Sequence, residues 1–355
     1  MKNVLTCDLV IGARPNFVKA AALVEAAKLF PEKIKLRLVH TGQHKEGMSD
    51  PYFSDLQLPP PVHLHDDLNL GSGFGQMIGR LDYFWYQQER DTYPDYVMVV
   101  GDTDSTAAAA IAAVKRRIPV IHVEAGLRCG DMNMQEEINR ILVDSVSDIF
   151  YTTSEGAREN LIREGHDPSM CRFVGNVMVD TLFRHLSEAK IRYRRPGQYA
   201  VLTLHRAENV DDKQKLASIM SAVDEVGSHI PVIFPIHPRT KSKWASSAWN
   251  VDFVPPMGYL EFISLLASAK FVMTDSGGVQ EETTALGVPC LTLRESTERP
   301  ETVEMGSNWV VGTDPASIIL AAAQLIGLKF KGFGGLPLWD GQAAVRIMKD
   351  LSEAA

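Results

Sequence analysis

Short apolar runs alternate with helical segments along the entire chain, and this alternation is the feature that most constrains its fold. Val4–Ile11, Pro119–Val123 and Val232–Ile236 each have the length and apolar character of a buried strand. Strands separated by helices pair in parallel, because a long crossover is needed to start the next strand in the same direction. The sequence therefore predicts an α/β fold with Rossmann-like, doubly wound parallel sheets.

The chain of 355 residues is long enough for two domains, and the alternation restarts in its second half. The basic, proline-containing segment Arg192–Gly197 has the composition of a linker, and a new strand is expected at Tyr199–Leu204. We predict a first domain over residues 1–181 and a second over residues 182–340. Since open α/β sheets bind ligands outside the carboxyl ends of their strands, we expect the two domains to face each other across a cleft.

The segment Thr274–Glu282 indicates a site for a nucleoside diphosphate. It follows an apolar run, and its Ser276-Gly277-Gly278 turn has no bulky side chain to keep backbone N–H groups from an anion. The helix that begins there adds its positive dipole end. One turn later, a carboxylate of Glu281 or Glu282 can accept from both hydroxyls of a ribose. A tight strand-to-helix connection is the alternative interpretation of the glycines.

Charged residues follow the expected strands of the first half. Arg14 and Lys19 come just after the first strand, where paired cations suit an anionic ligand and solvated surface charge is the alternative. Asp102 and Glu124 end two further strands, where ligands of open α/β sheets bind. On the helix that follows, Glu136 lies one turn before an arginine, Arg140, so an exposed salt bridge is the alternative there.

Composition excludes several classes of protein. The net charge is −8 without a basic stripe, which argues against nucleic acid as a partner. Four scattered cysteines without a C-x-x-C pair indicate reduced thiols, a cytoplasmic location and no structural zinc. No apolar run is long enough to span a membrane, and the run at residues 4–12 leads into a helix, so we interpret it as a strand rather than a signal peptide.

Taken together, the motifs resemble those of the non-hydrolysing UDP-N-acetylglucosamine 2-epimerases, in the same order and over nearly the whole chain. The resemblance rests on G-x-R-P-x-x-x-K at 12–19, G-Q-H at 42–44, G-D-T at 101–103, H-V-E-A-G-L-R at 122–128, E-E-x-N-R at 136–140, H-R-x-E-N at 205–209, P-x-H-P at 235–238, D-S-G-G-x-Q-E-E at 275–282 and T-E-R-P-E at 297–301. It implies a fold of the glycosyltransferase-B type, with the last helix, 341–355, packing back on the first domain. It also implies a homodimer and no metal or redox cofactor.

The resemblance also implies a reaction. The proton on carbon 2 of an N-acetylhexosamine is barely acidic, so inversion is feasible if UDP leaves carbon 1 while a base removes that proton, giving a glycal to which UDP adds back. The acid and base candidates are then Asp102, Glu124 and Glu136, and His205 stabilises the departing UDP. The implied binding residues, with Glu282 at the ribose and Phe262 beside the uracil, are Arg14, Lys19, Arg140, His237, Phe262, Ser276, Gly277, Gly278, Glu282 and Arg299.

Three alternatives stay open. The substrate can be a UDP-2,3-diacetamido-uronic acid, for which the motifs look much the same. A UDP-sugar glycosyltransferase is favoured by Asp102-Thr103-Asp104, which mimics a metal-binding D-x-D motif. A nucleotide-sugar sensor without catalysis is the third alternative.

Regulation is a separate question. Bacterial members of the family bind a second, allosteric UDP-sugar, for which Gln43 and His44 form a possible effector site. The Arg-Gln pair linked to that site is missing after Asn69-Leu70, where Gly71-Ser72-Gly73 stands instead. We therefore expect effector binding to be weak or absent and the kinetics to be close to hyperbolic.

Overall fold

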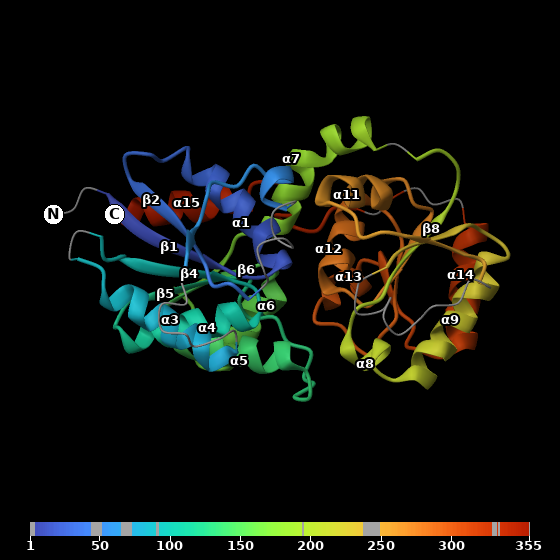
Figure 1. Ribbon diagram of the computed structural model, residues 1–355, viewed down its shortest axis with the longest axis horizontal. Helices are drawn as coiled ribbons and strands as arrows, with labels where there is room; N and C mark the ends of the chain where they lie inside the picture. The colour runs from blue at the N-terminus through green and yellow to red at the C-terminus, as the bar shows by residue number, and fades with distance from the viewer. Residues whose placement is uncertain are drawn as a thin grey trace. The chain divides into compact units, whose positions relative to one another are not determined.

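The computed structural model describes residues 4–43, 52–64, 73–89, 92–193, 195–236, 249–328, 332 and 334–354. The chain divides into two compact units, one formed by Met1–Thr181 with Pro337–Ala355 and the other by Leu182–Leu336 (Figure 1). Each unit is an α/β unit with its own parallel sheet. The predicted fold class is confirmed.

The first unit contains a seven-stranded sheet in the order β3-β2-β1-β4-β5-β6-β7, in which every pair is parallel. Its strands are β1 (Leu5–Ile11), β2 (Ile34–His40), β3 (Val62–His63), β4 (Tyr96–Val100), β5 (Val120–Val123), β6 (Ile149–Thr152) and β7 (Cys171–Phe173). Its helices include α1 (Arg14–Ala27), α3 (Phe74–Tyr86), α4 (Asp104–Lys115), α5 (Gln135–Val146), α6 (Glu155–Arg163) and α15 (Ala343–Ala354), and α7 (Val177–Arg192) begins in it.

The second unit contains a six-stranded sheet in the order β10-β9-β8-β11-β12-β13, again with parallel pairs. Its strands are β8 (Ala200–Thr203), β9 (Val232–Pro235), β10 (Val251–Val254), β11 (Phe271–Thr274), β12 (Cys290–Thr292) and β13 (Asn308–Val310). Its helices include α8 (Ala207–Val210), α9 (Lys213–Gly227), α11 (Tyr259–Ala267), α12 (Gly277–Leu286), α13 (Pro300–Glu304) and α14 (Pro315–Gly327).

Each sheet has a point where the strand order reverses. In the first unit the chain moves outward from β1 to β2 and β3, then returns to β4 on the other side of β1. In the second unit it moves from β8 to β9 and β10 and returns to β11 on the other side of β8. At such a point the connections from two neighbouring strands run to opposite faces of the sheet, and open α/β sheets bind their ligands there, outside the carboxyl ends of the strands. The sequence motifs follow the carboxyl ends of β1, β4, β8 and β11.

Small side chains bring helix α4 close to the first sheet. The helix contains a run of alanines, Ala107–Ala110, that are completely buried. They pack with Trp85 of α3 and with Val97 and Val99 of β4 in one core cluster. Close packing matters here because the N-terminus of α4 follows Asp102 directly. None of the described helices is long and apolar enough to cross a membrane.

The C-terminal helix α15 belongs to the first unit, where it packs beside α1 (Figure 1). Its buried residues recur at helical spacing and form an apolar stripe: Ala343, Ala344, Ile347, Met348 and Leu351. The backbone N–H of Ala344 donates to Asp180 Oδ2 over 2.7 Å. Before the helix, Trp339 Nε1 donates to the carbonyl of Thr153 over 2.9 Å. These contacts hold a segment from the end of the chain against residues about half the chain away.

The Asp180 carboxyl group makes this attachment sensitive to pH. Burial raises the pKa of Asp180 from 3.8 to about 6, although hydrogen bonds from the N–H groups of Ala344 and Ala343 and the charge of Arg346 lower it. Between pH 3.8 and about 6, the Asp180 carboxyl group therefore binds more protons in the folded chain than in the unfolded chain. Its contribution to stability is therefore complete below pH 3.8 and is lost as the pH rises through about 6.

We expect Asp180→Asn to become more stable than the natural chain as the pH rises from about 4 to about 7. The difference between a pKa of 3.8 and one of about 6 corresponds to about 3 kcal/mol. Denaturant unfolding of both proteins at several pH values measures it, and all other titrating groups cancel in the comparison. A difference in unfolding free energy that stays constant with pH would contradict this account.

Candidate functional site

The turn after β1 is tied to the turn after β4 by the side chain of Asn16. Its Oδ1 accepts from the N–H groups of Gly12 and Ala13 at 3.3 and 3.1 Å, and its Nδ2 donates to the carbonyl of Val100 over 2.9 Å. Asn16 is 1% exposed, and Oδ1 also accepts from Thr103 Oγ1. The sequence analysis assigned Asn16 no role, because that role depends on Val100, which follows 84 residues later.

A buried ion pair joins Lys19 of α1 to Glu124, which follows β5. Lys19 Nζ lies 2.6 Å from Glu124 Oε1, and the two side chains are 4% and 1% exposed. A Cβ atom on Gly101 would lie 2.6 Å from Lys19 Nζ, so the turn after β4 is packed directly against this pair. The sequence assigned Lys19 to the phosphates, whereas the structure places its ammonium group on a candidate catalytic carboxylate.

The backbone at Glu124 adopts a conformation that is rare for a residue with a side chain. Its φ is +71°, in the left-handed region. Such a residue costs about 1–3 kcal/mol and persists only where its surroundings hold it. The N–H groups of Glu124 and Ala125 both donate to the carbonyl of Tyr151, at 2.9 and 3.1 Å. Strain of this kind is often found at functional sites.

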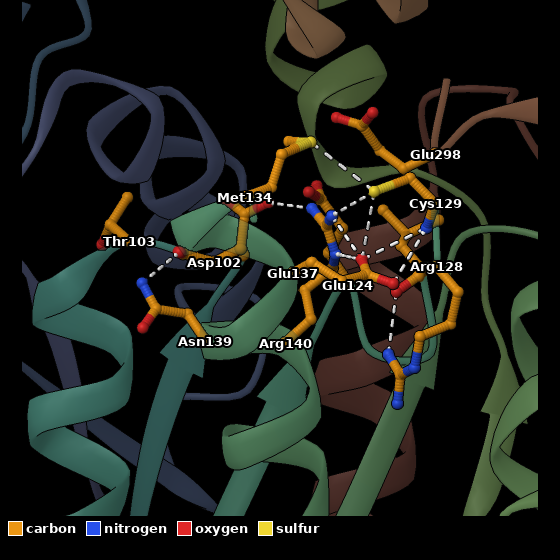
Figure 2. A network of polar contacts seen from close by, with 12 residues as sticks. Asp102, Thr103, Glu124, Arg128, Cys129, Met134, Glu137, Asn139, Arg140 and Glu298 are labelled. Atoms are coloured by element: carbon orange, nitrogen blue, oxygen red, sulfur yellow. Dashed lines mark hydrogen bonds and ion pairs between the residues drawn. The ribbon is translucent and has the colours of Figure 1, made fainter. Parts of the chain in front are cut away.

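Asp102 is held by Arg140, and Arg140 is held in turn by Glu137 (Figure 2). Arg140 Nη1 donates to Asp102 Oδ2 over 2.5 Å, while Nη2 and Nε donate to Glu137 Oε2 over 2.6 and 2.9 Å. Arg140 is 1% exposed, so the alternative of an exposed salt bridge was wrong for this residue. Glu136, on the first turn of α5, is half-buried.

Glu137 is a residue that the sequence analysis missed. Besides Arg140, it binds the N–H group of Cys129 over 3.1 Å (Figure 2). It also binds the N–H group of Gly130 over 2.8 Å, and so it orders the loop before α5. Burial opposes its ionisation, but the hydrogen bonds from Gly130 and Arg140 outweigh burial and lower the pKa of Glu137. The adjacent acid in E-E-x-N-R therefore organises the site that holds Asp102.

The Asp-x-Asp pattern at 102–104 is occupied by side chains of α5. Asn139 Nδ2 donates to Asp104 Oδ1 over 3.1 Å and to the backbone carbonyl of Asp102 over 2.9 Å. Thr103 caps α4 by accepting from the N–H of Thr106. Among the described residues, no group of three or more His, Cys, Asp or Glu side chains has an arrangement that could hold a metal ion.

In the second unit, Asp275 joins the carboxyl ends of β8 and β11. It is completely buried, and its carboxylate accepts from the N–H groups of His205 and Arg206 at 2.9–3.2 Å. His205 Nδ1 lies 3.0 Å from Asp275 Oδ1, so the partly exposed imidazole is held by one ring nitrogen. Burial opposes the ionisation of Asp275, but the neighbouring His205 and the backbone donors outweigh burial and lower the pKa of Asp275. The sequence analysis quoted Asp275 in a motif but assigned it no role.

Ser276, Gly277 and Gly278 begin helix α12, with Ser276 at the N-cap. The first N–H groups of a helix have no partner within the helix, so they can bind an anion here. A Cβ atom on Gly277 would lie 2.5 Å from Arg299 Nη1 and 2.7 Å from Glu298 Oε1, which explains the need for glycine.

Arg299 lies buried against Gly277. Its guanidinium binds Glu281 and Glu298 over 2.7 and 2.6 Å, and its side chain is 4% exposed. Arg299 therefore has two buried carboxylate partners, whereas the family resemblance implied that it binds UDP.

Glu281 and Glu282 are neighbours with different surroundings. Glu281 binds Arg299, whereas burial raises the pKa of Glu282 to about 8, an effect that a hydrogen bond from Tyr259 reduces and the Glu281 charge increases. Phe262 of α11 is half-buried and packs against the apolar cluster beneath that helix. The two neighbouring carboxyl groups therefore have different electrostatic surroundings.

The expected effector residues are only partly described. His44 and also His237, from the list of binding residues, lie outside the described residues. The Gln43 side chain accepts from Ser105 N and Oγ at 3.0 and 2.6 Å. Arg80 of α3, which the sequence analysis did not consider, is 8% exposed and lies beside Gly42. In the described part of the chain, Arg80 Nε and Nη2 have no hydrogen-bond acceptor.

Comparison with known proteins gives one consistent result. The family model described as UDP-N-acetylglucosamine 2-epimerase matches residues 28–352. A UDP-N-acetylglucosamine 2-epimerase of Methanocaldococcus jannaschii is 38% identical, over 97% of this chain and 98% of that protein. A UDP-2,3-diacetamido-2,3-dideoxy-D-glucuronate 2-epimerase of Pseudomonas aeruginosa is 39% identical, again over 97% and 98%.

Solved structures agree. The M. jannaschii UDP-GlcNAc 2-epimerase in complex with UDP-GlcNAc and UDP has a TM-score of 0.88 at 37% identity, covering 98% of this chain and 100% of that one. The Neisseria meningitidis enzyme bound to UDP-GlcNAc also has a TM-score of 0.88, at 28% identity and with the same coverage.

The Lys19–Glu124 pair predicts strong coupling between two substitutions. Lys19→Met leaves a buried carboxylate without its cation, and Glu124→Gln leaves a buried ammonium group without its anion. Each should reduce the free energy of unfolding by about 3–5 kcal/mol, while the double variant should recover most of that loss. Denaturant unfolding of the four proteins gives the coupling energy directly. Simple additivity of the two single losses would show that the pair is not formed in solution.

Proposed function

The chain belongs to the UDP-N-acetylglucosamine 2-epimerase family, and from that premise we propose that it inverts carbon 2 of a UDP-N-acetylhexosamine, converting UDP-GlcNAc to UDP-ManNAc without hydrolysis. The observation that carries the proposal is the family match over residues 28–352. Within that range, Asp102, Glu124 and Glu136 supply carboxyl groups after β4, after β5 and at the start of α5.

The proposed reaction is an elimination followed by an addition. A carboxylate of the first unit removes the proton from carbon 2 while the bond from carbon 1 to the UDP oxygen breaks, its electron pair leaving with UDP. A double bond forms between carbons 1 and 2. UDP then adds back to carbon 1 while another carboxyl group delivers a proton to the opposite face of carbon 2. No net electron transfer occurs, so the reaction as written requires no redox cofactor.

In this proposal the second unit binds UDP. The N–H groups at the start of α12 receive the diphosphate, where the helix dipole favours negative charge, and His205 stabilises the charge that develops on departing UDP. Glu282 accepts from the ribose hydroxyls and Phe262 packs beside the uracil. Arg14 of the first unit adds a cation for the phosphates, whereas Arg140 and Arg299 contribute mainly by holding Asp102 and the α12 turn.

A second candidate substrate is a UDP-2,3-diacetamido-uronic acid. It is favoured by the Pseudomonas relative, whose identity of 39% is as high as the 38% of the M. jannaschii UDP-GlcNAc 2-epimerase. Both substrates carry an acetamido group at carbon 2 and react there by the same chemistry. The proposal also includes a homodimer, a cytoplasmic location and a role in making cell-surface polysaccharide, as family membership implies.

Turnover in deuterated water should place deuterium at carbon 2 of the product. The abstracted proton passes to a carboxyl group that exchanges with solvent, so re-protonation delivers deuterium. Proton NMR of separate incubations with UDP-GlcNAc and with the diacetamido-uronate identifies the substrate and measures the incorporation. Epimerised product that retains its original proton would contradict the elimination, and no epimerisation of either sugar would contradict the function itself.

UDP binding should become tighter as the pH rises from about 6 to about 8 and should level off above that. A Glu282 carboxylate is the better acceptor for ribose hydroxyls, but its pKa of about 8 keeps the empty site protonated at lower pH. Affinity should therefore change by nearly tenfold per pH unit below 8. Calorimetric titration with UDP measures it, and Glu282→Gln serves as the control that removes this dependence. Identical pH profiles for both proteins would rule out the ionisation of Glu282 as its cause.

A further inference from the structure

A buried His–Asp pair lies beneath the acid/base residues of the first unit and has no part in the proposed proton transfers. His122 of β5 and Asp144 of α5 are both completely buried. His122 Nδ1 lies 2.6 Å from Asp144 Oδ1, and His122 Nε2 lies 3.0 Å from the backbone carbonyl of Gly101. A carbonyl oxygen can only accept, so Nε2 carries a hydrogen. Nδ1 faces a carboxylate oxygen, so both ring nitrogens of His122 are held by buried oxygen atoms.

The second carboxylate oxygen of Asp144 has its own partners. Asp144 Oδ2 accepts from the N–H of Gly126 at 3.1 Å and lies 2.7 Å from Arg128 Nη1. Burial opposes ionisation, but the charges and hydrogen bonds of His122 and Arg128 outweigh it and lower the pKa of Asp144. Arg128, His122 and one N–H group thus surround a carboxylate that is shielded from water.

The pair connects the two turns that carry Asp102 and Glu124. Gly101 immediately precedes Asp102, and Gly126 follows Glu124 by two residues. Both glycines have positive φ, +67° and +80°, and Glu124, on the same turn as Gly126, has a φ of +71°. Because Gly101 is also packed against Lys19 Nζ, a shift of its carbonyl would disturb Asp102 and the Lys19–Glu124 pair together.

We propose that His122 and Asp144 are positioning residues that fix the placement of Asp102 relative to Glu124 for proton transfer at carbon 2. The inference rests on the proposed function. Inversion needs two groups that act on opposite faces of the sugar, each within hydrogen-bond reach of carbon 2. When one group is displaced, the glycal and UDP formed by elimination persist longer before re-addition. More of both should then leave the protein as free products.

Two nearly isosteric substitutions separate the two hydrogen bonds of His122, one to Asp144 and one to the carbonyl of Gly101. In His122→Gln the amide nitrogen lies near the former Nε2, so the bond to Gly101 can survive while donation to Asp144 is lost. In His122→Asn the amide nitrogen lies near the former Nδ1, so the bond to Asp144 can survive while the bond to Gly101 is lost. We expect kcat to fall about 10- to 100-fold in both variants, with KM and the dissociation constant of UDP nearly unchanged, because misplacement of about 1 Å costs on that order. Free UDP and glycal should accumulate during turnover.

Asp8→Asn is the matched control. Asp8 is also completely buried, binding Arg37 over 2.6 and 2.7 Å and Trp85 Nε1 over 2.9 Å, but it contacts neither catalytic turn. It should lower the free energy of unfolding without changing kcat or the release of glycal. Asp144→Asn replaces the His122 variants if these do not fold, since its amide oxygen can still accept from Gly126.

The decisive measurements are kcat, KM, UDP affinity and the fraction of turnovers that end in free UDP. Preserved kcat in the His122 and Asp144 variants would overturn the proposal. A loss of kcat without release of glycal would also overturn it, if Asp8→Asn shows the same loss of kcat at an equal loss of unfolding free energy. Absence of epimerisation by the natural chain itself would instead count against the proposed function.

Discussion

Charge buried at the carboxyl ends of the strands is the constraint on which the site depends. A carboxylate removed from water needs a cation or several N–H donors beside it, and three buried acids of the site have them. Glu124 has Lys19, Glu137 has Arg140, and Asp275 has His205 together with backbone donors. Such pairs contribute little net stability, because the cost of desolvation offsets the attraction. They do determine where each carboxylate lies.

The glycines of the site have a related physical role. At Gly101 and Gly277 the space that a Cβ atom would fill is already taken by a cation, Lys19 in the first unit and Arg299 in the second. In both units a turn after a central strand is therefore packed against a charged side chain. This packing brings backbone N–H groups and carboxylates near the switch point of each sheet, where the crossover connections leave room for a ligand.

Two relatives of similar identity are named for different UDP-sugars, so the chemistry at carbon 2 and the selection of the sugar can depend on different residues. In the proposed reaction, removing and returning a proton at carbon 2 needs acid and base groups whatever the other substituents of the sugar are. The chain is 38% identical to a relative named for UDP-N-acetylglucosamine and 39% identical to one named for a diacetamido-glucuronate. Selection between the sugars depends on side chains that contact the other ring positions, and overall identity does not measure those few contacts.

The sequence by itself determined the α/β class, the parallel strands and the turns with functional residues, because these follow from local periodicity and from short motifs. It also identified the family, since nine motifs occur in order. Only the tertiary structure decided which charges meet. Lys19 was assigned to phosphate and lies on Glu124, while Arg140 proved to be buried between Asp102 and Glu137. Asn16, Asp144 and Asp275 had no assigned role until their partners were visible. Such pairings join residues that are often 70 or more positions apart. They depend on how helices pack on a sheet, and no local pattern in the sequence encodes that packing.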